Sequence, residues 1–271
     1  MTAPPGPRPP LDPDALATGL VPLGLRLELV ATTASTNALA AEHVRAGASP
    51  GLVVVAEEQT GGRGRLDRRW ETPPGTAAVY SCVLAPEVPA ASWPWLPLLT
   101  GLATARTLRR HGVDGGVKWP NDVLVDGLKV CGILAERVET PDGPACVVGA
   151  GVNVWLVADE LPVPTATSLA LLADQREPGS RPPSRNLVIA TVLAAFELLY
   201  RRWEALDDDA PFAASYLRRS DTLGRQVRVH LAGDVTVEGR AEALDADGRL
   251  VVRTDSGLQT FGAGDVVHLR S

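Results

Sequence analysis

Two Asp-Gly pairs constrain the fold of this chain more than any other feature of its sequence. Asp126-Gly127 and Asp142-Gly143 each lie between runs of residues that favour β-strands. An Asp-Gly pair suits the tight turn of a β-hairpin, because both central residues of that turn adopt positive φ angles. The middle of the chain is therefore predicted to form a largely antiparallel sheet.

Helical patterns alternate with further strand patterns before and after these hairpins. Apolar residues that alternate or run continuously predict strands at 25–30, 51–56 and 76–84. Apolar residues at helical spacing predict helices at 37–47, 94–110 and 185–206. The acidic residues Asp207 to Asp209 are expected to cap one more helix that ends at 218. This part of the chain is predicted to be α+β, with one large mixed or antiparallel sheet and flanking helices.

The pattern changes after residue 222, where short alternating runs follow one another closely. These runs lie at 226–231, 235–244, 248–254, 257–262 and 265–270. Turns containing glycine separate them, which is typical of a small barrel that closes its own edges. We expect three parts: a Pro-rich disordered tail at 1–24, a large domain at 25–220 and a small β-barrel domain at 221–271.

Composition narrows the class of protein. The 271 residues are 45% hydrophobic and carry a net charge of −6, so the chain can bury a large core and has no broad attraction to nucleic acid. Cys82, Cys131 and Cys146 are far apart and lack metal-ligand spacing, which argues against a disulfide framework and a zinc site. No apolar run approaches the roughly 20 residues of a membrane span, and the start lacks the order of a secretory signal. We expect a cytoplasmic protein.

A segment rich in arginine and glycine, QTGGRGRLDRRW at 59–70, is the first candidate for chemistry. It contains Arg63, Arg65, Arg68 and Arg69. Glycine lets the backbone approach a ligand closely, and guanidinium groups bind phosphate and carboxylate. Taken alone, this segment is also compatible with a solvated surface loop or a weak nucleic-acid contact.

A second polar segment, KWPNDVLVDGLKVCGILAE at 118–136, supplies Lys118, Asn121, Asp122 and Lys129 on predicted paired strands. Both segments suit the activation of an acid by a nucleotide, in which a carboxylate attacks the α-phosphorus. Two anions about 4 Å apart repel by roughly 4 kcal/mol at an effective dielectric near 20, so such a site needs fixed cations. The alternatives are that Lys118 is a solvated strand end and that Asp122 only supports the turn.

The ordered set of motifs resembles the biotin protein ligase family. The set comprises Ser35-Thr36-Asn37, Gln59 with GRGR at 62–65, Arg68 with Trp70, KWPND at 118–122, Lys129 with Gly132, and GAGVNV at 149–154. The resemblance is to the short, monofunctional form that lacks an N-terminal DNA-binding domain. It implies a class II synthetase-like catalytic domain followed by an SH3-like barrel. It also implies that ATP and biotin form biotinyl-5′-AMP and pyrophosphate, after which biotin passes to a lysine of a carrier domain.

The same resemblance implies a role for each matching residue. The catalytic set would be Arg63, Lys129, Asp122 and Lys118. The biotin-binding set would be Ser35, Thr36, Asn37, Gln59, Gly62, Arg63, Gly64, Arg65, Lys129 and Gly132. The nucleotide-binding set would be Arg65, Arg68, Trp70, Asn121, Asp122, Asn153 and Arg270. Trp70 would stack on adenine, and Asp122 would lie near Mg²⁺. The expected partners are biotin and the biotin carboxyl carrier domain of an acyl-CoA or pyruvate carboxylase.

Three other functions compete with this interpretation. A lipoate or octanoate ligase would share the large domain, a nucleic-acid-binding module would use the arginines, and a biotin sensor would bind without catalysis. Specific DNA recognition needs an element shaped for a groove, and the N-terminal sequence offers none. We expect no specific nucleic acid, no membrane contact, and a monomer or weak homodimer.

Overall fold

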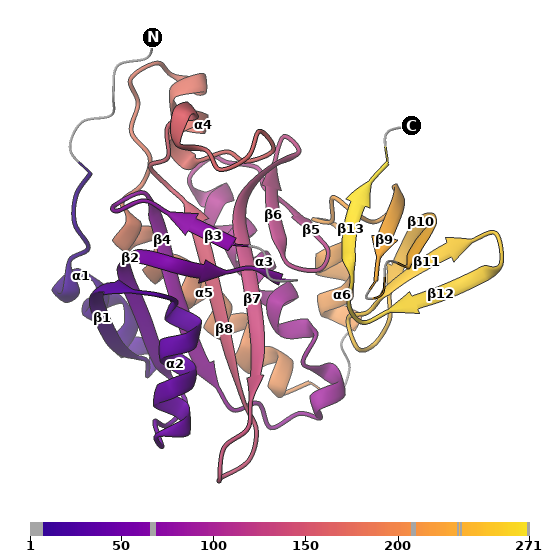
Figure 1. Cartoon of the computed structure of the whole chain (residues 1–271), viewed down its shortest axis with the longest axis horizontal. Helices are drawn as coiled ribbons and strands as arrows, with labels where there is room; N and C mark the ends of the chain where they lie inside the picture. The colour runs from indigo at the N-terminus through magenta and orange to yellow at the C-terminus, as the bar shows by residue number, and fades with distance from the viewer. Residues whose placement is uncertain (1–7, 66–68, 207–209, 232, 234, 270–271) are drawn as a thin grey trace.

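The structure is a computed structural model that describes residues 8–65, 69–206, 210–231, 233 and 235–269 (Figure 1). Its longer helices are α1 (Pro13–Leu20), α2 (Thr36–Arg45), α3 (Trp95–Arg110), α4 (Leu169–Arg176), α5 (Arg185–Glu204) and α6 (Ala210–Leu217). The strands before residue 200 are β1 (Arg26–Thr33), β2 (Leu52–Arg63), β3 (Arg69–Thr72), β4 (Ala77–Leu84), β5 (Gly116–Lys118), β6 (Asp122–Val125), β7 (Leu128–Val138) and β8 (Ala145–Asn153). The later strands are β9 (Gln226–His230), β10 (Thr236–Leu244), β11 (Leu250–Thr254), β12 (Gly257–Phe261) and β13 (Asp265–His268).

The first eight strands form one sheet in the order β1-β2-β4-β8-β7-β6-β5, with β3 paired to β2. β1 and β2 run parallel, and the neighbouring pairs from β2 to β5 run antiparallel. Both predicted hairpins are confirmed: Asp126 and Gly127 have φ angles of 51° and 78° between β6 and β7, and Gly143 has a φ of 114° between β7 and β8. The positive angles are those that an Asp-Gly turn supplies.

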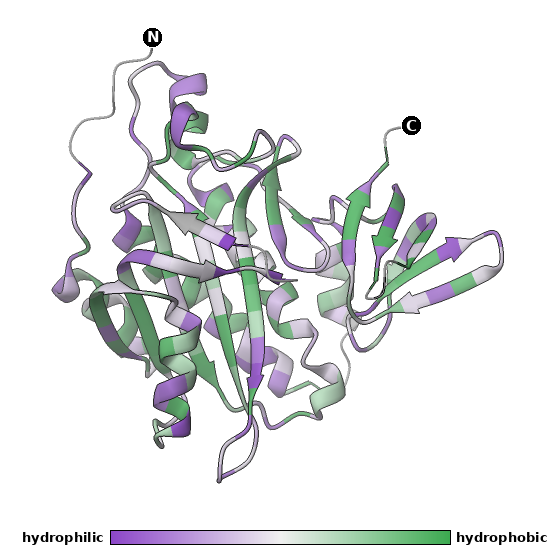
Figure 2. Cartoon of the chain, viewed as in Figure 1, coloured by the Kyte–Doolittle hydropathy of each residue, from purple (hydrophilic) through white to green (hydrophobic). Residues whose placement is uncertain are grey.

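Helices cover both faces of this sheet and give two cores. Along β2, Val53 and Val55 pack in the larger core with α1, α3 and α5, whereas Val54 packs in the smaller core with Ala40 and Val44 of α2. This alternation follows from the two-residue repeat of a strand. Hydrophobic residues accordingly concentrate in the central strands (Figure 2). The predicted fold class is confirmed: a large mixed sheet with flanking helices, followed by a small all-β part.

On the α2 side of the sheet, side chains become smaller along β8 and leave room for a ligand. Val147 packs against α2, but Gly149 and Gly151 follow on the same face. Gly132 on β7 lies directly opposite Gly151 in the antiparallel register. Glycines at alternate strand positions therefore create the hollow on this face of the sheet.

The predicted disordered tail at 1–24 is wrong for the part that includes α1. Leu11, Leu16 and Leu20 are buried in the larger core, and the carboxylate of Asp12 accepts hydrogen bonds from the backbone N–H groups of Asp14 and Ala15. These are the apolar spacing and the N-cap of a helix, which the high proline content obscured. The first seven residues of the tail lie outside the described residues.

Two other elements correct or limit the predictions. Residues 59–63 belong to β2 and pair with β3, so half of the predicted arginine-glycine loop is a β-ribbon. Asp207 to Asp209, the expected helix cap, lie outside the described residues, and α6 begins at Ala210. Within the described ranges, no helix is long and apolar enough to cross a membrane.

The C-terminal strands form a five-stranded antiparallel sheet in the order β12-β11-β10-β9-β13. Two buried tryptophans of the large part donate their indole N–H groups to the turn between β10 and β11: Trp95 to the carbonyl of Ala246 at 2.8 Å, and Trp119 to that of Gly248 at 3.1 Å. These bonds hold the small sheet against the start of α3 and the residue that follows β5.

Candidate active site

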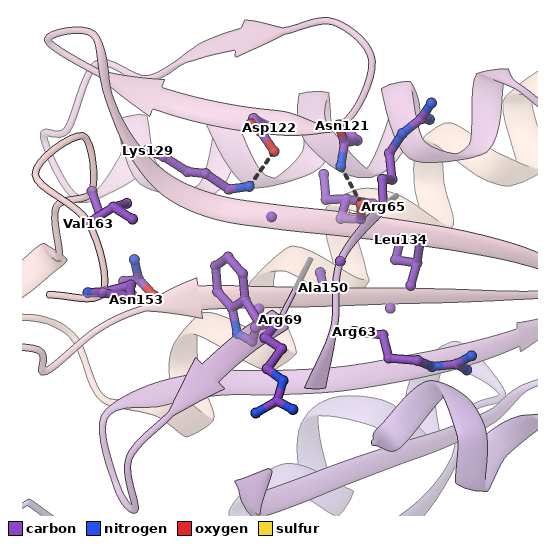
Figure 3. Close-up of a pocket in the computed structure, with 18 of the residues that line it drawn as sticks. Arg63, Arg65, Arg69, Asn121, Asp122, Lys129, Leu134, Ala150, Asn153 and Val163 are labelled. Carbon is purple, nitrogen blue, oxygen red and sulfur yellow. Dashed lines mark hydrogen bonds and ion pairs between the residues drawn. The ribbon is translucent and has the colours of Figure 1, made fainter. Parts of the chain in front are cut away.

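A cavity of about 690 Å³ lies over the glycine-lined region of the sheet (Figure 3). It is bounded by the start of α2, the β2–β3 ribbon, the β6–β7 hairpin and β13. The predicted residues that line it are Ser35, Thr36, Asn37, Gln59, Arg63, Gly64, Arg65, Trp70, Lys118, Asn121, Asp122, Lys129, Gly132 and Asn153. Segments far apart in the sequence thus contribute to one site.

One end of the cavity is a neutral, buried hydrogen-bond network. The backbone N–H and the hydroxyl of Thr36 both donate to Oε1 of Gln59, at 2.9 and 3.0 Å. The hydroxyl of Ser81 lies 2.6 Å from Oδ1 of Asn37 and 2.8 Å from the hydroxyl of Thr36. Ser81 is fully buried, and the other three side chains are nearly so. Mutual bonding satisfies these polar groups, so this end holds its shape before a ligand arrives.

Asn37 ties the network to β7 and β8. Its Nδ2 donates to the carbonyl of Leu134 at 3.2 Å and to the carboxylate of Glu136 at 2.7 Å. Its Oδ1 lies so near β8 that a Cβ atom added to Gly149 would be 2.0 Å away. Glycine is therefore required at position 149 if Asn37 is to keep this position.

The arginines of the ribbon lie around the opening of the cavity, and Arg63 shares the Glu136 carboxylate with Asn37. Arg63 forms an ion pair with Glu136 at 3.2 Å, and Arg65 donates to the carbonyl of Gly264 at 3.3 Å. Arg69 also lines the cavity. Figure 3 shows the three side chains extending from the ribbon in different directions. The positive charge is thus spread around the opening rather than gathered at one point.

A second cationic group lies on the hairpin. Nζ of Lys129 is 2.7 Å from Oδ1 of Asp122 and 5.4 Å from the centre of the Trp70 ring (Figure 3). The Trp70 ring itself packs on the backbone of Gly132 and Gly151, where an added Cβ would meet it at 2.7 and 2.6 Å. Trp70 therefore forms a flat wall of the cavity with a cation beside it.

The amide side chains are anchored through one of their groups. Nδ2 of Asn121 donates to the carbonyl of Ile133 at 2.8 Å, and Nδ2 of Asn153 donates to the carbonyl of Thr167 at 3.0 Å. Anchoring through Nδ2 fixes the direction of each side chain. Lys118 lines the cavity at the end of β5.

One predicted residue does not join this set, and two others lie outside the described residues. Gly62 does not line the cavity: an added Cβ would meet Nε2 of Gln59 at 2.3 Å and the carbonyl oxygen of Trp70 at 2.4 Å, so the glycine allows β2 and β3 to approach. Its expected biotin contact is corrected to a structural role. Arg68 and Arg270 lie outside the described residues.

Comparison with known proteins places this geometry in a family. Residues 29–153 match the Biotin/lipoate A/B protein ligase family, and residues 222–269 match the Biotin protein ligase C terminal domain. The chain is 38% identical over 272 residues to the biotin--[acetyl-CoA-carboxylase] ligase of Mycobacterium tuberculosis, with 97% of each chain covered. This chain belongs to the biotin protein ligase family. The family resemblance inferred from its motifs is thereby confirmed.

More distant biotin protein ligases agree. The chain is 29% identical to the bifunctional ligase/repressor BirA of Bacillus subtilis, with 94% of this chain and 79% of that protein covered. It superposes on the biotin protein ligase from Aquifex aeolicus in complex with biotin and ATP with a TM-score of 0.75 at 26% identity, covering 91% of this chain and 99% of that chain.

Three residues in or beside the cavity were not predicted by sequence reasoning: Ser81 and Glu136 bond to residues that line it, and His268 lines it. Ser81 is a small polar residue in a largely apolar strand, and Glu136 follows Gly132 at even spacing on β7, so the sequence contained a signal for both. His268, to which no role was assigned, lines the cavity from β13. Its Nε2 lies 3.2 Å from the hydroxyl of Thr222. Burial, helped by the charges of Lys118 and Arg225, lowers the pKa of His268 to about 4, so its ring is neutral at pH 7.

The residues present fit a magnesium ion held mainly by substrate. Among the described residues no group of three or more His, Cys, Asp or Glu side chains forms a ready metal site. Asp122 nevertheless offers a carboxylate in the cavity. Mg²⁺ is commonly held by one or two carboxylates together with substrate phosphates, and this arrangement meets that requirement.

Proposed function

We propose that this chain attaches biotin, with ATP, to a specific lysine of a biotin carboxyl carrier domain. Membership of the family and the name of the M. tuberculosis relative support this function. The observation that carries it is a single cavity with a neutral hydrogen-bonding end and a cationic end. Such a cavity matches a substrate with an uncharged ring at one end and a carboxylate at the other.

The neutral end would bind the ureido ring of biotin. The Ser35–Asn37 turn, with Gln59, presents backbone and side-chain groups that both donate and accept. A ureido group has one carbonyl acceptor and two N–H donors, so it needs that mixture. A second carboxylate would be disfavoured at this depth, because Asn37 already bonds to the carboxylate of Glu136.

The cationic end would hold the carboxylate and the phosphates. We assign Arg63, Gly64, Arg65 and Lys129 to the biotin carboxylate, and Arg65, Arg69, Asn121, Asp122 and Asn153 to the nucleotide, with Lys118 beside the phosphates. Arg63 and Lys129 each have an acidic partner in this structure, so an arriving anion would compete with Glu136 and Asp122 for them. Trp70 would face adenine. When bound at Asp122, Mg²⁺ would neutralise phosphate charge.

The reaction balances without a covalent enzyme intermediate. A biotin carboxylate oxygen would bond to the α-phosphorus of ATP, and the bond to pyrophosphate would break, which gives biotinyl-5′-AMP. The uncharged amine of the carrier lysine would then attack the acyl carbon and expel AMP, and the nitrogen would release one proton to water as the amide forms. The cations would reduce the repulsion between the two anions that meet in the first step.

Incubation with labelled biotin, ATP, Mg²⁺ and a biotin carboxyl carrier domain tests the proposal. We expect label on the carrier, and none on a carrier whose acceptor lysine is replaced by arginine. The family that residues 29–153 match also contains lipoate ligases, so parallel reactions with lipoate and octanoate test whether this chain attaches one of those acids instead. The match of residues 222–269 to a biotin-specific C-terminal domain favours biotin. Transfer of lipoate without transfer of biotin would reject the assignment.

The proposal extends to the cellular setting. Cys82, Cys131 and Cys146 are all free and buried, which is consistent with a reducing compartment such as the cytoplasm. We also propose that the protein is a monomer or a weak homodimer.

A further inference from the structure

A second cavity lies on the opposite side of the large sheet from the proposed active site. It has a volume of about 300 Å³ and is enclosed by α3, α5 and α6. Three arginines line it, one from α3 (Arg106), one from α5 (Arg202) and one beyond the end of α6 (Arg218). The proposed ligase reaction uses none of them.

The positive charge around this cavity is concentrated. Burial lowers the pKa of Arg106, and the charges of Arg219, Arg202, Arg218 and Arg110 lower it further. Four other guanidinium groups therefore lie close enough to Arg106 to repel its charge. This occurs in a chain whose net charge is −6, so the cluster does not reflect a generally basic surface.

Acidic side chains of the described residues do little to balance this charge. Arg219 pairs with Asp114 at 3.1 Å, but the Asp114 side chain is 86% exposed and the pair is screened by water. Within the described ranges, Arg106, Arg202 and Arg218 have no ion pair, and Arg218 donates to the hydroxyl of Ser215 at 3.2 Å. Neither Arg106 nor Arg202 has an acid three or four residues away on its helix.

The shape of the cavity selects among anions. Arginines from α3, from α5 and from beyond the end of α6 line one hollow, which suits an anion with several oxygens and more than one charge. Leu199, Pro211 and Phe212 form an apolar wall beside them, so part of the ligand can be uncharged. A compact phosphate ester or polyphosphate meets both conditions.

We propose that the cavity between α3, α5 and α6 is a second anion site, which binds a polyphosphate group either free or carried on a nucleoside. The ligand would neutralise Arg106, Arg202 and Arg218 together, and would join α6 to the two long helices. The site is separate from the catalytic cavity and does not depend on the proposed reaction.

Isothermal titration at low ionic strength with inorganic pyrophosphate, and separately with ADP, tests the site. The catalytic cavity also has cations, so three proteins are compared: wild type, Arg63→Ala/Lys129→Ala, and Arg106→Gln/Arg202→Gln/Arg218→Gln. We expect the first two to keep a binding event that the third loses by at least tenfold in affinity. Tighter binding of ADP than of pyrophosphate would identify a nucleotide, and the reverse order a free polyphosphate.

Matched controls keep the result interpretable. Arg201→Gln changes the neighbouring residue of α5, which pairs with Glu197 outside the cavity, and should bind as wild type does. If the triple variant does not fold, the exposed residues Arg202 and Arg218 are replaced singly, each with an expected loss of at least threefold. Equal affinity in wild type and in these variants overturns the proposal.

Two further outcomes would also overturn it. Asp207 to Asp209 precede α6 in the sequence. If pyrophosphate or ADP binds only after all three are changed to Asn, these acidic residues neutralise the arginines and the cavity is not a ligand site. Duplex DNA that binds through these arginines with a steep salt dependence, while pyrophosphate and ADP do not, would assign the cluster to nucleic acid instead.

Discussion

The two ends of the proposed active site differ in how far they are preorganised before a ligand binds. The neutral end consists of buried groups that bond to one another, with Thr36, Gln59 and Ser81 at most 8% exposed. The cationic end is open: the Arg63 side chain is 52% exposed and is paired with Glu136, and Lys129 is paired with Asp122. One end is rigid through packing, whereas the other is a set of replaceable ion pairs.

This difference matches the groups that each end is proposed to bind, an uncharged ring at one end and anions at the other. An uncharged ring offers only hydrogen bonds, which discriminate well when donors and acceptors are fixed and dry. Anions attract cations over longer distances and tolerate looser geometry, so the cations can stay solvated and switch partners. Substitutions at the neutral end should therefore reduce both stability and biotin binding, whereas substitutions at the cationic end should reduce ligand binding and turnover with little change in stability.

The largest effect is expected from Arg63→Ala/Lys129→Ala. Each side chain is assigned a charge-assisted hydrogen bond worth about 1.5 to 3 kcal/mol, so together they predict a loss of about 100-fold to 10,000-fold in biotin-dependent pyrophosphate exchange. The melting temperature should change little, because both ion pairs are partly exposed. Arg137→Ala on the same strand serves as the control and should keep normal exchange. Undiminished turnover in the double variant would contradict the assignment of these cations.

A smaller loss, of about 100-fold in biotin affinity, is expected from Gly149→Ala. The added Cβ would lie 2.0 Å from Oδ1 of Asn37, and overpacking of this kind costs about 1 to 3 kcal/mol. The melting temperature should fall as well, whereas it should change little for substitutions at the cationic end. Adding Asn37→Ala should restore stability, since it removes the clash, without restoring biotin binding. Normal biotin affinity in Gly149→Ala would show that the neutral end is not preformed.

About a tenfold loss of biotin affinity is expected from Ser81→Ala. The change removes the hydroxyl that joins Thr36 to Asn37, and an unsatisfied buried group costs about 1 to 3 kcal/mol. Ser92→Ala, on the short turn before α3, controls for the loss of a serine elsewhere. Equal biotin affinity and stability in the two variants would remove Ser81 from the network.

The smallest effect concerns pH and His268. Its pKa in the folded protein is about 4, below the ordinary 6.5. Between these two pH values the unfolded chain binds a proton at this residue and the folded chain does not, so protonation favours the unfolded state as pH falls. Stability at pH 7 is unaffected by this group, and it should decline between pH 6.5 and 4. Urea unfolding of wild type and His268→Gln across that range measures the effect, and the variant should show the flatter dependence. Parallel curves would exclude a contribution from His268.

Much of the fold could be predicted because its determinants are local. The Asp-Gly turns, the capped helix after Ser35 and the short alternating runs after residue 222 each act within a few residues, and all appear in the structure. The helix α1 was missed because the prolines around it outweighed Leu16 and Leu20, whose burial depends on α5, distant in sequence. Local patterns do not report such partners.

The candidate site was predicted less evenly. Motif residues such as Asn37, Asp122 and Lys129 were named correctly as members of one cavity, since their order along the chain identifies the family. Their bonding partners Ser81 and Glu136 were not predicted, because these residues reach the site only through the register of β4, β7 and β8. The sequence also gave no sign that Gly62 separates two backbones rather than touching a ligand.

The tryptophan contacts to the C-terminal sheet have a consequence for engineering. Trp95 and Trp119 lie deep in the large part of the chain, yet their N–H groups end on carbonyls near residue 247. A truncation after residue 220 would strand both indoles without acceptors and would also delete His268 from the cavity wall. The last fifty or so residues therefore supply acceptors that the large part needs, so removing them should cost stability as well as a wall of the cavity.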